Sequence, residues 1–221
     1  MKRTVIATTD GSKTIYIEEM DETYHSSHGA IQEAKHVFIK NGLEVLESDS
    51  IRVFELGFGT GLNALLTCKF ANDADRFIEY HGIEAFPVSL EMASEMDYPS
   101  LIEGDYSPHF ESIHSNKRDD LIEITDKFSL KKIEAKIQKV ELDPDYYDIV
   151  FFDAFGPRAQ SEMWEMEILK KMYDALKVNG VLVTYCAQGQ FKRNLKALGF
   201  TVESLPGPPG KREMTKAIKN N

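Results

Sequence analysis

Three glycines alternate in the segment "ELGFGTGLN", which runs from Glu55 to Asn63 directly behind the apolar stretch "IRVF". Glycine at positions 57, 59 and 61 permits a tight turn and lets a ligand approach the backbone closely. A nucleoside triphosphate would require GxxxxGK[ST], and no Lys-Ser or Lys-Thr pair follows these glycines. A dinucleotide would favour GxGxxG, whose last glycine falls one residue later than it does here. The spacing therefore favours a nucleoside cofactor without a pyrophosphate, and S-adenosylmethionine fits an acidic strand end followed by GxGxG.

Two further acidic residues stand where predicted strands end. Glu84 follows "RFIEYHGI" at about the 20-residue spacing from which a carboxylate receives the hydroxyl groups of a ribose. Asp153 ends "YYDIVFF", a nearly all-apolar strand pattern, where partial burial raises the pKa of a carboxyl group. Ligands of an open α/β sheet bind beyond the carboxyl ends of its strands, so we expect Glu55, Glu84 and Asp153 on one rim.

The three acids have different expected roles. Glu55 would face the positive amino group of the cofactor, directly or through water. Asp153 would accept a hydrogen bond from an amine and orient the lone pair of that amine towards a methyl group. The structural alternatives are a solvated loop residue for Glu84, and an N-cap or loop anchor for Asp153.

Other motifs with chemical meaning are weak in this sequence. His25 and His28 in "ETYHSSHGA" lack a third histidine or a cysteine nearby, so we interpret them as loop histidines and predict no metal. The absence of GxSxG, HExxH and CxxC argues against a serine hydrolase, a zincin and a dithiol enzyme. Cys68 and Cys186 lie in apolar contexts and are predicted to be buried free thiols, which indicates a reducing cytoplasm.

The composition is that of one globular domain. The chain has 221 residues, of which 42% are hydrophobic and 28% charged. It has no apolar run near the roughly 18 residues that span a bilayer, and its start does not resemble a signal peptide, so we expect no membrane association.

The net charge of −10 argues against a general nucleic-acid binder, because neutralising phosphates needs a basic face. Basic residues nevertheless gather late in the chain. A local nucleic-acid contact and an ordinary solvated face are both open for this late basic group, which comprises Lys192, Arg193, Lys196, Lys211, Arg212, Lys216 and Lys219.

Residues 1–48 form a predicted N-terminal extension. "TVIATTDGSKTIYI" alternates on both sides of Asp10-Gly11, which predicts a β-hairpin. "HGAIQEAKHVFIKNGL" has the apolar spacing of an amphipathic helix that stops at Gly42.

Residues 49–221 alternate strand and helix patterns, which predicts a doubly wound, mostly parallel α/β sheet. A helix is expected to begin with Ser161 as its N-cap and to end before Gly180. Residues 116–132 are interpreted as a small insertion, within which the alternation from Leu121 to Leu130 suggests strands, and 135–142 as a short helix. The segment "REMTKAIK" is expected to close the sheet as its final edge strand.

Four segments together resemble the methyltransferase half of the MnmC family of bifunctional tRNA-modifying proteins: "VFELGFGTGLNALLT", "FFDAFGPRAQSEMWEMEILKKM", "GVLVTYCAQGQFKRNLKALGF" and "PGPPGKREM". "DETYHSSHGAIQEAKHVFIKNGL" is similar to the N-terminal segment of that family. The resemblance covers nearly the whole chain except 116–132. The combination of these motifs is specific, whereas the glycine loop alone would fit any class I methyltransferase.

The resemblance implies a class I, Rossmann-like methyltransferase of tRNA wobble uridine. A methyl group would pass from S-adenosylmethionine to the amine of 5-aminomethyl-2-thiouridine, giving 5-methylaminomethyl-2-thiouridine. Asp153 is the matching residue for holding the amine, and tRNA contacts would fall to Lys192, Arg193, Lys211 and Arg212. The implied cofactor contacts are Glu55, Gly57, Phe58, Gly59, Gly61, Asn63, Glu84, Asp153, Ala154 and Phe155.

The sequence departs from the family pattern in two places. Larger members carry a C-terminal FAD-dependent oxidase that makes the amine, whereas this chain stops at Asn221 and resembles a free-standing form. A separate oxidase is therefore a candidate partner. Where many class I enzymes show Gly-Asp near the adenine, this sequence reads "IEAK" at 133–136.

Two other functions remain open at this point. One is methylation of a small-molecule amine, which the net acidity favours. The other is a non-catalytic domain that binds the cofactor or tRNA as an assembly partner, against which Asp153 and the intact glycine loop argue.

Overall fold

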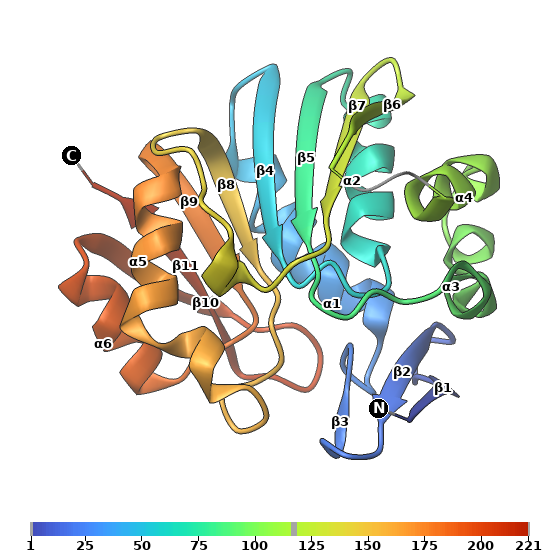
Figure 1. Ribbon diagram of the computed structural model, residues 1–221, viewed down its shortest axis with the longest axis horizontal. Coiled ribbons are helices and arrows are strands. Elements are labelled where there is room, and N and C mark those ends of the chain that lie inside the picture. The colour runs from blue at the N-terminus through green and yellow to red at the C-terminus, as the bar shows by residue number, and fades with distance from the viewer. Residues whose placement is uncertain (1, 116–118, 221) are drawn as a thin grey trace.

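The computed structural model describes residues 2–115 and 119–220, and its centre is a mixed sheet flanked by helices on both faces (Figure 1). Within these residues the sheet has eight strands, and those of its middle run parallel. Their spatial order is β10 (Phe200–Pro206), β11 (Glu213–Lys219), β9 (Leu176–Thr184), β8 (Tyr147–Phe152), β4 (Ser50–Leu56), β5 (Phe77–Ile83), β7 (Phe128–Ile133) and β6 (Leu121–Thr125). The expected doubly wound α/β class is confirmed.

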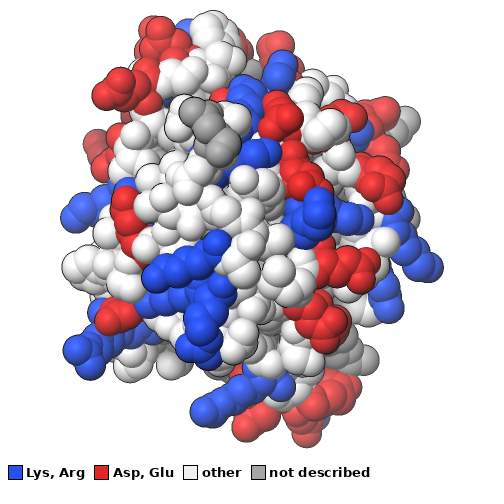
Figure 2. Space-filling model, turned by 90° about the vertical axis from the view of Figure 1, so that its left-hand side faces the viewer, with Lys and Arg blue, Asp and Glu red and all other residues white. Residues whose placement is uncertain are grey.

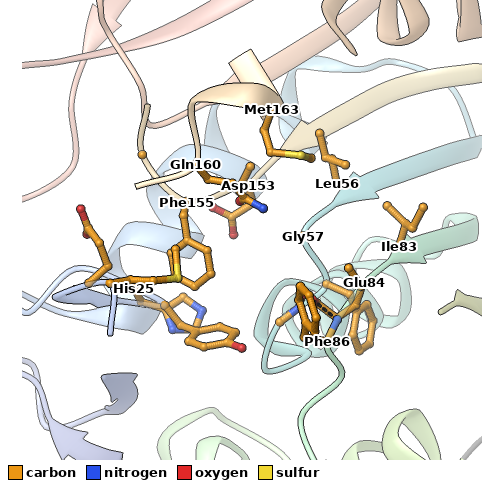
Figure 3. A pocket seen from close by; sticks show the side chains of 18 of the residues that line it. His25, Leu56, Gly57, Ile83, Glu84, Phe86, Asp153, Phe155, Gln160 and Met163 are labelled. Carbon is orange, nitrogen blue, oxygen red and sulfur yellow. Dashed lines mark hydrogen bonds between the residues drawn. The ribbon is translucent and has the colours of Figure 1, made fainter. Parts of the chain in front are cut away.

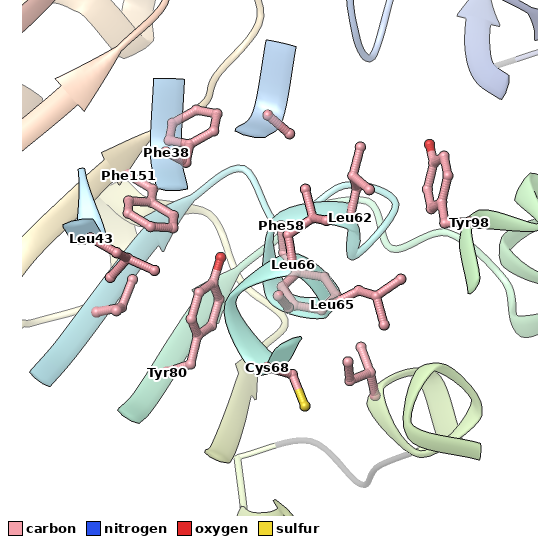
Figure 4. Packing of buried hydrophobic residues seen from close by; sticks show 14 of the residues in the cluster. Phe38, Leu43, Phe58, Leu62, Leu65, Leu66, Cys68, Tyr80, Tyr98 and Phe151 are labelled. Atoms are coloured by element: carbon pink, nitrogen blue, oxygen red, sulfur yellow. The ribbon is translucent and has the colours of Figure 1, made fainter. Parts of the chain in front are cut away.

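Apolar side chains on the two faces of the sheet form separate cores. One core lies between the sheet and α1 (Ala30–Ala34), α2 (Leu62–Asp73) and α4 (Ser107–Ser115), and it also includes residues of α3 (Leu90–Met96), which packs against α4. Figure 4 shows part of this core around Tyr80 and Phe151. The other core packs α5 (Met166–Ala175) and α6 (Gly189–Ala197) against the opposite face. Cys68 and Cys186 are buried free thiols, as predicted.

The N-terminal extension forms a small sheet and a helix beside the main sheet. The predicted hairpin is β1 (Arg3–Ala7) and β2 (Lys13–Ile17), and a short β3 (Glu22–Thr23) follows it. The predicted helix begins as α1 and continues as a π-helical segment, Lys35–Lys40. Arg3 ties this small sheet to the loop after β5, because its guanidinium donates hydrogen bonds to the carbonyls of Phe86 and Pro87.

The prediction that the C-terminal strand lies at the edge of the sheet is wrong. β11 lies between β9 and β10 and pairs antiparallel with both, so β10 is the edge. The reason is burial. Met214, Thr215 and Ala217 of β11 are fully buried, whereas β10 carries exposed polar side chains such as Thr201 and Ser204. An edge strand tolerates that polarity because it lacks one neighbour.

The interpretation of 116–132 as an insertion is also wrong for the residues that the structure describes, which exclude 116–118. β7 pairs parallel with β5 along its whole length and lies next to the edge of the eight-stranded sheet. β6 folds back antiparallel onto β7 as the edge strand. The alternating pattern of this segment therefore reflects two strands of the main sheet, and only Ile137–Lys139 of the expected helix at 135–142 is helical.

The helix expected from Ser161 to Gly180 is shorter. Ser161–Trp164 is a 3-10 turn, α5 begins after Glu165, and the chain passes directly into β9 at Leu176. Asn179 has a φ of 67°, and the β8–β9 register shifts beside it. This irregularity lets "KVNG" run within a strand, although its sequence is typical of a helix end.

No helix among the described residues is long and apolar enough to cross a membrane.

Candidate active site

A cavity of about 740 Å³ lies at the carboxyl ends of β4, β5 and β8, beside the N-terminal extension (Figure 3). The structure brings most of the sequence-predicted residues to its wall: Gly57, Phe58, Gly59, Asn63, Glu84, Asp153, Ala154, Phe155 and Lys211. Five others do not line it: Glu55, Gly61, Lys192, Arg193 and Arg212. The rim expected from strand ends is therefore present, with Glu55 set behind it.

Contacts and backbone geometry within the chain itself favour glycine at all three positions of the loop. All three glycines have positive φ values, 94° at Gly57, 52° at Gly59 and 73° at Gly61. A Cβ atom at Gly57 would lie 2.3 Å from the Asp153 carbonyl oxygen, and one at Gly59 would lie 3.0 Å from the Tyr24 ring. A Cβ atom at Gly61 would meet the His114 ring at 2.9 Å. Side chains are excluded here by neighbouring protein atoms before any ligand is considered.

Glu84 joins the glycine loop to the end of β5. Its Oε2 accepts a hydrogen bond from the Gly59 amide at 3.0 Å, and its Oε1 accepts one from the Phe86 amide at 2.8 Å. Each carboxylate oxygen keeps a second lone pair for a further donor. Because Glu84 also lines the cavity, it can accept the hydroxyl hydrogens of a ribose.

Asn63 bridges the two other acids. Its Nδ2 donates hydrogen bonds to Glu55 Oε1 and to Asp153 Oδ2, both at 2.8 Å. Glu55 has no exposed surface, whereas Asn63 and Asp153 reach the cavity. Glu55 therefore influences a ligand through Asn63.

Burial changes the charge of both carboxyls. It raises the pKa of Glu55 well above its ordinary value, and the charge of Asp153 adds to this effect. It also raises the pKa of Asp153 to about 7, with a further contribution from the charge of Glu33. Burial therefore favours the protonated form of Glu55, while Asp153 is close to its midpoint at neutral pH and can accept or release a proton.

The N-terminal extension supplies wall residues that sequence reasoning missed, among them Arg3, Tyr24 and Glu33. The Tyr24 ring packs edge-on against Phe155 with centroids 5.1 Å apart, and burial raises the pKa of Tyr24 to about 12. His25 also lines the cavity, where burial lowers its pKa to about 4. The polar and aromatic cluster "ETYHSSHGA" in a loop was the available signal for this wall.

The residues of the late basic group have different surroundings and do not form one continuous site. Lys211 lies in the cavity wall and pairs with Glu33. Lys192 pairs with Glu213 at 2.8 Å, and Arg193 donates to the Gln190 side chain. The face that α5 and α6 cover shows a patch of Lys and Arg side chains with acidic side chains around it (Figure 2).

Fold and site together define a methyltransferase. The chain belongs to the family described as S-adenosyl-L-methionine-dependent methyltransferase, which matches residues 102–220. Its cofactor is therefore S-adenosylmethionine.

Curated relatives narrow the class. The chain is 30% identical, over 96% of its length, to the tRNA 5-methylaminomethyl-2-thiouridine biosynthesis bifunctional protein MnmC of Cupriavidus metallidurans. It is 27% identical, over 98% of its length, to the uncharacterized protein MJ0670 of Methanocaldococcus jannaschii, of which it covers 59%. The chain spans about a third of the length of the MnmC relative.

A crystal structure described as MNMC2 from Aquifex aeolicus has the same fold. Its TM-score is 0.75 at 24% identity, and the match covers 98% of this chain and 69% of that chain.

The residues present fit the cofactor. Asn63 is 3% exposed and lines the cavity, and its Oδ1 has no hydrogen-bond partner among the described residues. A buried acceptor without a partner is costly unless a ligand donates to it, and the ammonium of an amino acid is a suitable donor. Asn63 and Glu84 thus offer acceptors for the amino group and the ribose of S-adenosylmethionine.

Proposed function

We propose that the protein transfers a methyl group from S-adenosylmethionine to the amine of 5-aminomethyl-2-thiouridine at the wobble position of tRNA, giving 5-methylaminomethyl-2-thiouridine. The observation that carries this proposal is Asp153, held by Asn63 at the cavity wall with a carboxyl pKa of about 7. The names of the MnmC relatives support the choice of substrate.

When bound, S-adenosylmethionine supplies a methyl group on a positively charged sulfur. Glu84 would hold the ribose, and Asn63 Oδ1 would accept from the amino group of the methionine part. A cavity of about 740 Å³ lies in the usual range for ligand sites, about 300 to 1,000 Å³, and has room for more than the cofactor.

Asp153 would handle the proton of the substrate. An alkylamine is mostly protonated at neutral pH, and only its neutral form has a free lone pair. Asp153 Oδ would accept an N–H hydrogen bond and take up that proton, and it would also orient the nitrogen. Holding reacting atoms at about 3 to 3.5 Å supplies several kcal/mol towards the barrier.

Contacts to tRNA are proposed for the exposed part of the late basic group. Among the described residues neither Arg193 nor Arg212 forms an ion pair, although the charge of Arg212 helps to lower the pKa of Glu213, whereas Lys192 pairs directly with Glu213. A separate FAD-dependent oxidase is proposed as a partner that supplies the amine, because the MnmC relatives are named as bifunctional proteins.

A second candidate is methylation of a small-molecule amine. It is favoured by the net charge of −10 and by the pairing of Lys192 and Lys211 with acids. The same cavity would then receive a free amine.

The test is methyl transfer by the purified protein. tRNA that carries 5-aminomethyl-2-thiouridine, tRNA with unmodified uridine and free alkylamines are each incubated with labelled S-adenosylmethionine, and nucleosides are analysed by mass spectrometry. We expect 5-methylaminomethyl-2-thiouridine from the first substrate alone. Methylation of free amines only would establish the second candidate, and no transfer to any substrate would indicate a non-catalytic domain.

A further inference from the structure

One end of the cavity holds a second buried carboxylate, Glu33 of α1. The residue is 7% exposed and lines the cavity together with Asp153. Its Oε1 accepts a hydrogen bond from the Ser26 amide at 3.0 Å, and its Oε2 pairs with the ammonium of Lys211. The charge of Glu33 helps to raise the pKa of Asp153, whereas the charge of Lys211 lowers it.

Lys211 binds Glu33 in the way that a small alkylammonium ligand would. Its Nζ lies 3.7 Å from the centroid of the Tyr185 ring, so the cation is held between a carboxylate and an aromatic face. Tyr185 is fixed in turn, because its hydroxyl donates to the Ala154 carbonyl at 2.7 Å. The Lys211 side chain is 31% exposed and comes from the loop between β10 and β11, so it can leave this position without unfolding a strand.

We propose that Glu33 is the binding site for the ammonium group of the substrate, and that the substrate takes the place of Lys211 there. This inference rests on the proposed function, since it assumes an aminomethyl substrate. Lys211 then serves as an internal counter-ion that neutralises Glu33 until the substrate arrives. The exchange of one ammonium for another leaves the charge of the cavity unchanged.

The exchange places the substrate nitrogen beside Asp153. One N–H bond of the ammonium breaks and an O–H bond forms at Asp153 Oδ, which leaves a neutral amine with its lone pair free. In methyl transfer an N–C bond would form while the methyl–sulfur bond breaks and the sulfur leaves as a neutral thioether, so that the nitrogen would again carry a positive charge and Asp153 would release its proton to water. A neutral group at the same position of the uridine cannot replace Lys211, so Glu33 selects for an amine.

The experiment compares two probes that differ only in charge. Anticodon stem-loop RNAs carry either 5-aminomethyl-2-thiouridine or its neutral 5-hydroxymethyl analogue at the wobble position, and binding is measured by fluorescence anisotropy. We expect the wild type to prefer the aminomethyl probe by on the order of 10- to 100-fold, the effect of a hydrogen bond between charged groups. Glu33→Gln, which keeps an acceptor for the Ser26 amide, should bind both probes alike.

The double variant Glu33→Gln/Lys211→Met is the matched control for folding. It removes both charges of the pair, so it leaves no ammonium without its carboxylate, and circular dichroism checks its fold. Equal binding of both probes by this double variant supports the inference. A preference for the aminomethyl probe that persists in Glu33→Gln or returns in the double variant overturns it, because Glu33 would then only hold Lys211.

Failure of the proposed function gives a different result. In that case the wild type itself binds the two probes alike and methylates neither.

Discussion

Asp153 and Glu55 are two neighbouring carboxyls that accept hydrogen bonds from the same amide group, that of Asn63. Burial raises both pKa values: that of Glu55, which is fully enclosed, well above its ordinary value, and that of Asp153, which faces the cavity, to about 7. The acid that reaches the ligand is the one able to exchange a proton at neutral pH.

We expect Asp153→Asn to lower the turnover number by roughly 10²- to 10⁴-fold, the range for a positioned proton-handling group. The variant still accepts a hydrogen bond from Asn63, so cofactor affinity should stay close to that of the wild type. Single-turnover kinetics and calorimetry measure the two quantities separately. Near-normal turnover in a folded variant would make Asp153 a loop anchor.

We also expect Asp153→Asn to be more stable to unfolding than the wild type, by an amount that depends on pH. Below about pH 4 the carboxyl is protonated in both states, so it adds no pH dependence. Between about pH 4 and 7 the unfolded chain ionises while the folded protein stays protonated, so the wild type loses stability as the pH rises. Asp153→Asn lacks this loss.

The difference in the free energy of unfolding between Asp153→Asn and the wild type should therefore grow from pH 4 to 7 and then level off. Urea denaturation at several pH values measures it. A difference that does not vary with pH would contradict the raised pKa.

Among the elements, β4 and β8 pair in parallel, and the glycine loop lies where both strands end. The Asp153 amide donates to the Leu56 carbonyl at 2.9 Å, and the Asp153 carbonyl occupies the space that a side chain at position 57 would need. Tight packing of two strand ends therefore requires glycine at this position. The glycine loop and the loop that follows β8 therefore pack directly against each other.

We expect Gly57→Ala to destabilise the protein by about 1 to 3 kcal/mol or more, because overpacking adds to the strain of a positive φ. Gly156→Ala is the matched control, since its Cβ would have only the Tyr185 hydroxyl within 4 Å, at 3.9 Å. Thermal denaturation of both variants measures the difference. Equal stability of the two would show that the packing between these loops relaxes easily.

At the scale of the whole molecule, acidic residues outnumber basic ones by 36 to 26. Several basic residues of the late group are neutralised by ion pairs, Lys192 with Glu213 and Lys216 with Glu203. Association with tRNA would therefore depend on the few unpaired cations. Phosphate binding by such residues makes affinity strongly dependent on salt.

We expect Arg193→Ala and Arg212→Ala each to weaken tRNA binding and to reduce the slope of log affinity against log salt by about 1. Lys170→Ala is the control, since Lys170 already pairs with Asp174 on an exposed face of α5. Cofactor affinity should not change in any of the three. Slopes equal to that of the control would assign Arg193 and Arg212 to an ordinary solvated surface.

The alternation of strands and helices, the glycine turn and the acids at the ends of β5 and β8 could be predicted from the sequence. These features are local: the period of apolar residues follows burial, and a parallel sheet brings its strand ends to one edge. The position of β11 beside β9, the parallel pairing of 128–133 with β5, and the place of Tyr24 and Glu33 in the cavity wall depend on how the elements pack. Glu33 and Lys211 lie 178 positions apart, and their pairing depends on how whole elements pack. Contacts between residues this far apart in the sequence form only when whole elements pack together. The local periodicity of the sequence does not predict which elements will do so.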